Sequence, residues 1–357
     1  MKLKKLTIIA LSALAGAAAG CTDFVEPGKD NVLTREDVIE NPVLAEGILL
    51  KAYDNLPTTL NYTEVAVDDA HSNNISNGYM LAAQGAWRST SDPFSQWRNY
   101  TQIAYINYFL DQIVDEVKWS YTSEWRAEHF PNRLKGEAYA LRAYHHSLIL
   151  QAHAGKSSSG ELLGVPYMDR FISSKHEQDG LQRLSFAECV GKIEKDIERA
   201  LQLLPDRYEN APAGTPDKED YDVVYGSRNT NRISGLAMKM LRARVRLLAA
   251  SPAFNPTNDP ALWEKAAESA AEVIDAFGGL SNLASNRVVF YLDKSNKDIL
   301  WREDYTNSSN LEKAQFPPSL NGSGRVSPSQ NFVDAFPMKS GYPIGADGSG
   351  FDERNPF

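Results

Sequence analysis

Amide, aromatic and guanidinium side chains gather in one irregular stretch of the sequence, residues 68–97, and together they could bind a sugar. The apolar faces of a sugar ring stack on Trp and Tyr, whereas its hydroxyl groups need polar partners. The stretch shows no sustained helical or strand period, and an aromatic residue on a loop is not readily explained by core packing. The candidate ligand contacts are Asn73, Asn74, Tyr79, Trp87 and Arg88. The alternative role for each of them is to anchor the loop.

Three other aromatic residues are placed by their neighbours in the sequence. Trp97 falls on an apolar helical stripe, and Trp301 lies within a predicted strand, so we expect both in the core. Tyr305 follows the end of that strand and is a weaker candidate for ligand binding.

No group of residues forms a strong catalytic or metal-binding signature. His145, His146 and His153 lie on one predicted helix, but no carboxylate or cysteine stands beside them at a ligand spacing, so we expect polar-face histidines. The acid pair Asp68 and Asp69 could serve a glycosidase only if the two carboxylates had a suitable separation. We therefore predict a protein without cofactor, metal or enzymatic activity.

Residues 1–20 have the features of a signal peptide. Three lysines precede an apolar run of fourteen residues, which is short for a membrane-spanning helix of about 20. Ala-Ala-Gly then stands directly before Cys21, as in bacterial lipoprotein signals, where the cysteine becomes the lipidated first residue. We predict lipid attachment at Cys21, and the alternative is an ordinary signal peptide cut nearby.

Charge and cysteine content limit the partners. The formal net charge is −9, and it becomes −12 without the three signal lysines, which argues against nucleic acid or an anionic membrane face as partner. Cys189 is the only other cysteine, so the core rather than a disulfide framework must hold the fold. No later segment is apolar enough to span a bilayer, so we expect membrane contact through the lipid alone.

The rest of the chain is organised around residues 133–155, RLKGEAYALRAYHHSLILQAHAG. Leu134, Ala138 and Leu141 fall at helical spacing, while Arg142 and His146 belong to a polar stripe on the opposite side. The small alanines would let partner helices come close. Residues 234–251 repeat this alanine-rich pattern, which suggests stacked helical hairpins of the tetratricopeptide kind.

Further helices are expected at about 34–55, 97–117, 185–204 and 262–277, with short strands at 288–292 and 299–303. The predicted fold class is therefore mainly α, with tetratricopeptide-like hairpins, long loop insertions and a short β-hairpin. The predicted layout is a signal peptide at 1–20, a tether at 21–33 and one helical domain at 34–357.

Several motifs taken together resemble the SusD/RagB family of outer-membrane nutrient-binding lipoproteins. They are Cys21-Thr-Asp-Phe, Trp97…Tyr100…Ile103…Asn107…Leu110, Gly136-Glu-Ala-Tyr-Ala-Leu-Arg-Ala-Tyr, Gly164-Val-Pro-Tyr, Leu241-Arg-Ala-Arg-Val, and Pro328-Ser-Gln…Val333-Asp-Ala-Phe-Pro-Met-Lys. No single motif is very specific, but the order and spacing of all of them together are specific. Family chains normally continue well past a segment like residues 352–357, so we expect this chain to be truncated at its C-terminus.

The resemblance implies a surface-exposed lipoprotein of the outer membrane, facing the cell exterior. It would bind oligosaccharides or related nutrients and deliver them to a SusC-type TonB-dependent transporter. Two alternatives stay open: a tetratricopeptide-type lipoprotein scaffold that binds other proteins, and a lipid-anchored glycosidase.

Overall fold

The computed structural model describes residues 33–57, 62–86, 88, 92–94, 96–119, 123–283, 296, 298–302 and 308–355. Signal peptide, Cys21 and most of the tether lie outside these residues.

The central helix, α6 (Glu124–His153), is longer than predicted. Ser123 caps it by accepting a hydrogen bond from the backbone N–H of Arg126. The predicted apolar face is confirmed, because Leu134, Ala138 and Leu141 are fully buried. The polar stripe on the opposite side was predicted to be a polar face of the helix, and this prediction is wrong.

Arg142, His145 and His146 are all buried as well. They find hydrogen-bond partners on neighbouring segments, which is what burial of polar groups requires. Helix α6 is therefore surrounded by protein around these residues.

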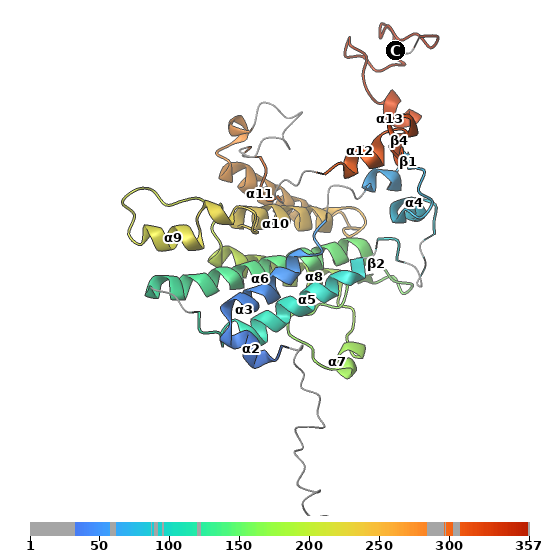
Figure 1. Cartoon of the computed structure of the whole chain (residues 1–357). Helices are drawn as coiled ribbons and strands as arrows, with labels where there is room; N and C mark the ends of the chain where they lie inside the picture. Colours follow the sequence, from blue (N-terminus) through green and yellow to red (C-terminus); the bar gives the residue numbers. More distant parts are fainter. Residues whose placement is uncertain are drawn as a thin grey trace, which may run out of the picture.

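The neighbours of α6 form a layered helical array (Figure 1). On one side lie α8 (Phe186–Leu203), α10 (Gly235–Ala250) and α11 (Pro260–Ala276). Ser185 caps α8 in a capping box with Glu188, as its sequence predicts. The stacked hairpins of the predicted fold class are confirmed.

On the other side of α6 lie α2 (Arg35–Glu40), α3 (Pro42–Leu50) and α5 (Asn99–Tyr108). The single helix expected at 34–55 is broken, because Asn41 ends α2 and caps α3, whose first residue is Pro42. Helix α5 continues into η5 (Phe109–Ile113), a π-helical turn. Phe109 and Ile113 of this turn are buried, and Leu110 packs partly buried against the core.

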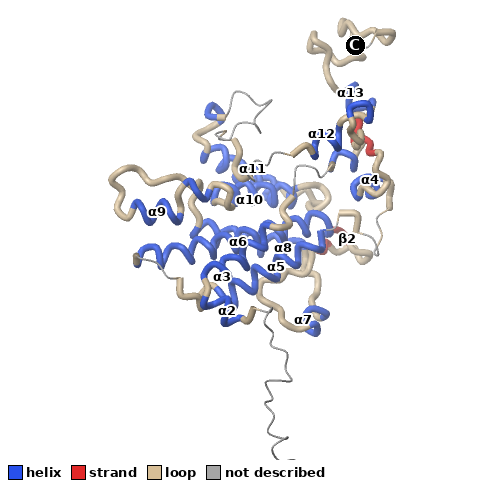
Figure 2. The backbone as a smooth tube through the Cα atoms, in the orientation of Figure 1, coloured by secondary structure: helices blue, strands red, loops and turns tan. Residues whose placement is uncertain are grey.

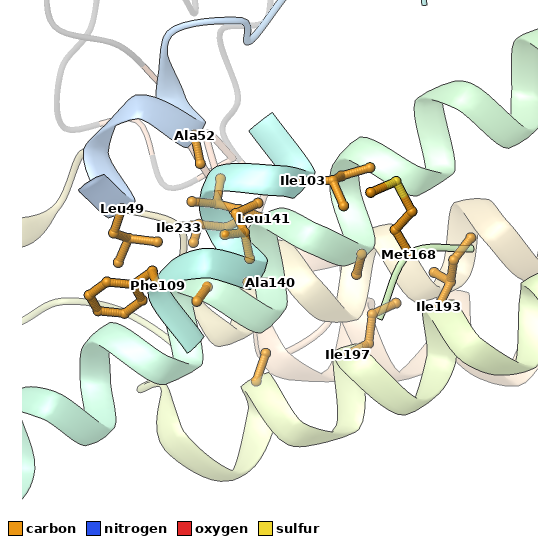
Figure 3. Close-up of a cluster of buried hydrophobic side chains, with 14 of the residues drawn as sticks. Leu49, Ala52, Ile103, Phe109, Ala140, Leu141, Met168, Ile193, Ile197 and Ile233 are labelled. Carbon is orange, nitrogen blue, oxygen red and sulfur yellow. The ribbon is translucent and has the colours of Figure 1, made fainter. Parts of the chain in front are cut away.

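These two sides share one apolar core, part of which is shown in Figure 3. It includes Leu49 and Ala52 from the N-terminal segment, Ile103 and Phe109 from α5 and η5, Ala140 and Leu141 from α6, and Ile193 and Ile197 from α8. Burial of the leucine, isoleucine and phenylalanine side chains among them stabilises the array by roughly 1.5–3 kcal/mol each.

Shorter elements decorate the array (Figure 2). They are η2 (Lys51–Tyr53), η3 (Thr63–Ala66), α4 (Gly78–Ala83), η4 (Gln96–Arg98), α7 (Lys175–Asp179), α9 (Lys218–Val224), η6 (Ser227–Asn229), η7 (Leu280–Asn282), α12 (Asn310–Gln315), η9 (Pro318–Leu320) and α13 (Gln330–Asp334). Helix α4 lies inside the stretch predicted to be a loop.

The strands also differ from the prediction. A short hairpin pairs β2 (Gly155–Lys156) with β3 (Leu162–Leu163), and β1 (Ala70–Ser72) pairs antiparallel with the distant β4 (Val326–Pro328). The expected strand at 288–292 lies outside the described residues, and residues 299–302 form no strand. Trp301 is half-buried against the core, where its indole N–H donates to the carbonyl of Asn231 at 2.9 Å.

Candidate functional site

The candidate site is centred on Trp97, which the sequence placed in the core. That prediction is wrong, because 41% of Trp97 is exposed. Trp97 belongs to η4, a turn of 3-10 helix with about three residues per turn, which precedes α5. The sequence prediction continued the α-helical spacing of α5 back to Trp97 and therefore placed the residue on the wrong face.

Two aromatic rings lie parallel to the Trp97 indole. The imidazole of His153, the last residue of α6, stacks on it with centroids 3.9 Å apart and planes 16° apart. The ring of Tyr100 lies offset, at 5.9 Å and 13°. Figure 1 shows the start of α5 and the end of α6 together beside β2, and this junction positions the stack.

A second row of rings fixes this stack to the core. The Tyr100 hydroxyl donates to the Pro166 carbonyl at 2.6 Å, and the Tyr100 ring meets the edge of His146. His146 in turn stacks on Tyr167 at 3.7 Å, and the Tyr167 hydroxyl donates to Asp196 at 2.8 Å. The exposed aromatic surface therefore rests on buried, hydrogen-bonded groups that limit its movement.

The same row explains the electrostatics beneath the site. Burial raises the pKa of Tyr100 and of Tyr167 well above the ordinary value, so both hydroxyls keep their protons. Arg142 donates to both carboxylate oxygens of Asp196, at 2.7 and 2.6 Å. Because this charge pair is satisfied internally, it anchors the site and offers no free charge to a ligand.

The segment before Trp97 makes polar and aromatic contacts of its own. Asp92 Oδ2 lies 3.4 Å from Nε2 of His153. The Phe94 ring packs on Tyr79 at 5.1 Å, and the pKa of Tyr79 is raised by burial and partly lowered by nearby Arg98. Among the candidates from the sequence, Tyr79 therefore contacts, through Phe94, the segment that leads to Trp97.

Tyr79 reaches this position through a close approach of two backbones. A Cβ added to Gly78, the first residue of α4, would lie 1.9 Å from the carbonyl oxygen of Pro93. Only glycine therefore permits α4 to pack against the segment that leads to η4.

The other predicted contacts have different surroundings. Asn73 donates to the Ser323 carbonyl at 2.7 Å, and Asn74 Oδ1 accepts from the Ser76 N–H at 3.1 Å, so both side chains hold loops. Arg88 is exposed. Trp87 and Tyr305 lie outside the described residues, and a ligand-binding role for all five stays a prediction.

Sequence reasoning missed Trp97, Tyr100, His153 and Asp92 as site residues. A usable signal was present, because Trp97 and Tyr100 stand three residues apart at a predicted helix start and would share a face. His153 is too distant in the sequence for any local pattern to place it against them.

Within the described ranges, no group of three or more His, Cys, Asp or Glu side chains could hold a metal ion. Of the helices described there, none has the length and apolar character needed to cross a bilayer.

Comparison with known proteins identifies the family. A family model described as SusD-like, starch-binding associating with outer membrane, matches residues 23–220, more than half of the chain. The chain belongs to the SusD-like family. None of the curated proteins matches it.

Solved structures of SusD-like proteins share the fold. One from Bacteroides fragilis aligns with a TM-score of 0.60 at 20% identity, covering 86% of this chain and 55% of its own. A SusD-like carbohydrate-binding protein from the same species gives 0.60 at 18%, covering 88% and 57%. A SusD homologue from Bacteroides thetaiotaomicron gives 0.52 at 19%, covering 74% and 46%. The chain therefore spans about half the length of these SusD-like proteins.

Proposed function

We propose that this SusD-like chain is a non-catalytic, glycan-binding lipoprotein. Its binding surface is the Trp97 stack, formed by the rings of Trp97, His153 and Tyr100. The observation that carries the proposal is the exposed indole of Trp97, which is fixed from behind by His153 and Tyr100. A rigid aromatic surface loses little conformational entropy when a sugar ring stacks on it. Arg98, which follows Trp97 in η4, is exposed and supplies a polar group for sugar hydroxyls.

The proposal includes location and delivery. The family description names starch binding and association with the outer membrane, and Cys21 stands directly after the small residues of a lipoprotein signal. We propose that a lipid on Cys21 holds the protein at the outer membrane, facing the exterior, and that it passes oligosaccharides to a SusC-type TonB-dependent transporter.

The test compares two tryptophans of nearly equal exposure. Trp97 is 41% exposed and Trp263, on α11, is 40% exposed. Calorimetric titration with a panel of oligosaccharides headed by maltoheptaose should give at least a tenfold loss of affinity for Trp97→Ala, about 1.4 kcal/mol. Trp263→Ala should bind as the wild type does.

If the wild type and Trp97→Ala bind the oligosaccharides with equal affinity, Trp97 is not part of the binding surface. The same panel separates the alternatives. Release of new reducing ends during the titration would indicate the glycosidase. Absence of any glycan binding, together with a stable protein complex in membrane extracts, would indicate the protein-binding scaffold.

A further inference from the structure

The imidazole of His153 lies beneath the Trp97 indole. The His153 side chain is 6% exposed, whereas Trp97 is 41% exposed, and the two rings are stacked face to face at 3.9 Å. The imidazole therefore covers the inner face of the indole, and the exposed part of Trp97 is directed to solvent.

Two charged residues hold His153 in place. Asp92 lies 3.4 Å from its Nε2. Arg183 donates to the backbone carbonyls of His153 and of Gly164, each at 2.7 Å. Because Gly164 directly follows β3, Arg183 links the end of α6 to the end of the β2–β3 hairpin. Ring and backbone are thus fixed by separate contacts.

We infer that His153 is a positioning residue for glycan binding: it fixes the plane of the Trp97 indole, and its protonation weakens the stacking of a sugar on that indole. The inference rests on the proposed function, because it concerns the same surface. The inference adds a pH dependence to the glycan affinity, which a surface made only of Trp and Tyr would not show.

The charged groups facing His153 come from three segments. Asp92, before η4, favours the imidazolium, as do the C-terminal carbonyls of α6, whereas Arg183, before α8, opposes it. Burial is the largest effect and lowers the pKa of His153 below its ordinary value of 6.5. The ring is therefore neutral at neutral pH and gains a proton only in acid.

Protonation acts on the indole as well as on the imidazole. The face of an indole is electron-rich and attracts both cations and the polarised C–H groups of a sugar. A cation on the inner face draws electron density away from the outer face, so the outer face attracts C–H groups less. Affinity should therefore fall as the pH falls through the lowered pKa of His153.

Titration of the full chain with maltoheptaose at several pH values tests this. The wild type should lose affinity as the pH falls from about 7 through the lowered pKa of His153, by about threefold once the ring is protonated. His153→Phe keeps an aromatic support that cannot be protonated, and its affinity should not depend on pH in this range. His153→Ala removes the support and should bind about tenfold more weakly at neutral pH.

Asp92→Asn provides a second, independent variant. Because Asp92 favours the imidazolium, its loss should move the acid midpoint to lower pH. An unchanged midpoint would show that Asp92 does not act on the ring that governs affinity.

Tryptophan fluorescence reports the stack without any ligand, since a protonated imidazole in contact with an indole quenches its emission. Acid quenching in the wild type should exceed that in Trp97→Phe and in His153→Phe. Trp125, which stacks on His129 at 3.9 Å, contributes equally to all three proteins and cancels in the difference.

The outcomes separate the inference from the proposed function. If Trp97→Ala loses maltoheptaose binding but the quenching difference is absent, or if His153→Ala binds normally, the inference is overturned and the function stands. If the quenching difference is present but Trp97→Ala binds maltoheptaose like the wild type, the glycan surface lies elsewhere and both are overturned.

Discussion

His146 lies fully buried about two turns before the end of α6, with both ring nitrogens engaged. Its Nδ1 donates to the carbonyl of Arg142 at 3.0 Å, and its Nε2 accepts from the N–H of Met168 at 3.1 Å. Nε2 can accept only while it carries no proton, so the folded protein requires the neutral imidazole. Burial accordingly lowers the pKa of His146 to about 3.

This depressed pKa predicts a loss of stability in acid. The unfolded chain takes up the proton near pH 6.5, whereas the folded chain resists it down to about pH 3. The stabilising contribution is therefore complete above pH 6.5 and declines as the pH falls, by about 2 kcal/mol between about pH 7 and about pH 5. Urea denaturation followed by far-ultraviolet circular dichroism should show it.

His146→Gln is the matched variant, because an amide can both donate and accept but does not titrate. Its unfolding free energy should be lower at neutral pH and should fall less steeply in acid. His145, also buried with a pKa lowered to about 4, titrates in both proteins and cancels in the difference. If the unfolding free energies of the two proteins fall equally steeply in acid, His146 is not the group responsible for the loss of stability.

At the scale of elements, helices with regular local signals could be predicted from the sequence. Helix α8 follows its cap at Ser185 and its apolar stripe, and α10 and α11 match the alanine-rich segments. An error arose where the backbone leaves α-helical geometry, in η4 at Trp97. A periodic pattern carries no information about such departures.

The close approach of α6 and α8 gives a prediction for two glycines. A Cβ on Gly136 would lie 2.8 Å from Leu204 and 2.9 Å from Leu203, whereas Gly191, inside α8, has no atom within 4 Å of its added Cβ. Alanine improves helix propensity at both sites by about 1 kcal/mol, but overpacking costs about 1–3 kcal/mol. Gly136→Ala should therefore destabilise and Gly191→Ala should stabilise.

Thermal melting of the two variants beside the wild type measures this directly. The two changes have the same chemistry, so opposite signs isolate the packing effect. A rise in melting temperature for both would mean that α8 can move away from α6 without loss of core contacts.

At the scale of the whole molecule, the candidate site depends on contacts between distant parts of the chain. Trp97 and Asp92 precede α5, His153 ends α6, and Arg183 precedes α8. The pairing of β1 with β4 joins segments still further apart. Sequence patterns identify helices one at a time, so they predicted the array but not the junction at which these residues meet.

The lipid anchor is the remaining prediction at this scale, and the chain offers its own control. Cys21→Ala should abolish labelling by a radioactive fatty acid and shift the protein from the membrane to the soluble fraction, because a lipid chain contributes about 0.8 kcal/mol per buried methylene to membrane binding. Cys189 is fully buried, and its thiol donates to the carbonyl of Val165 at 3.3 Å, so it is inaccessible to an acyl transferase in the folded chain. Cys189→Ala should therefore keep both the label and the membrane fraction. Persistent labelling of Cys21→Ala, or its retention in the membrane fraction, would show that the protein is held at the membrane in another way.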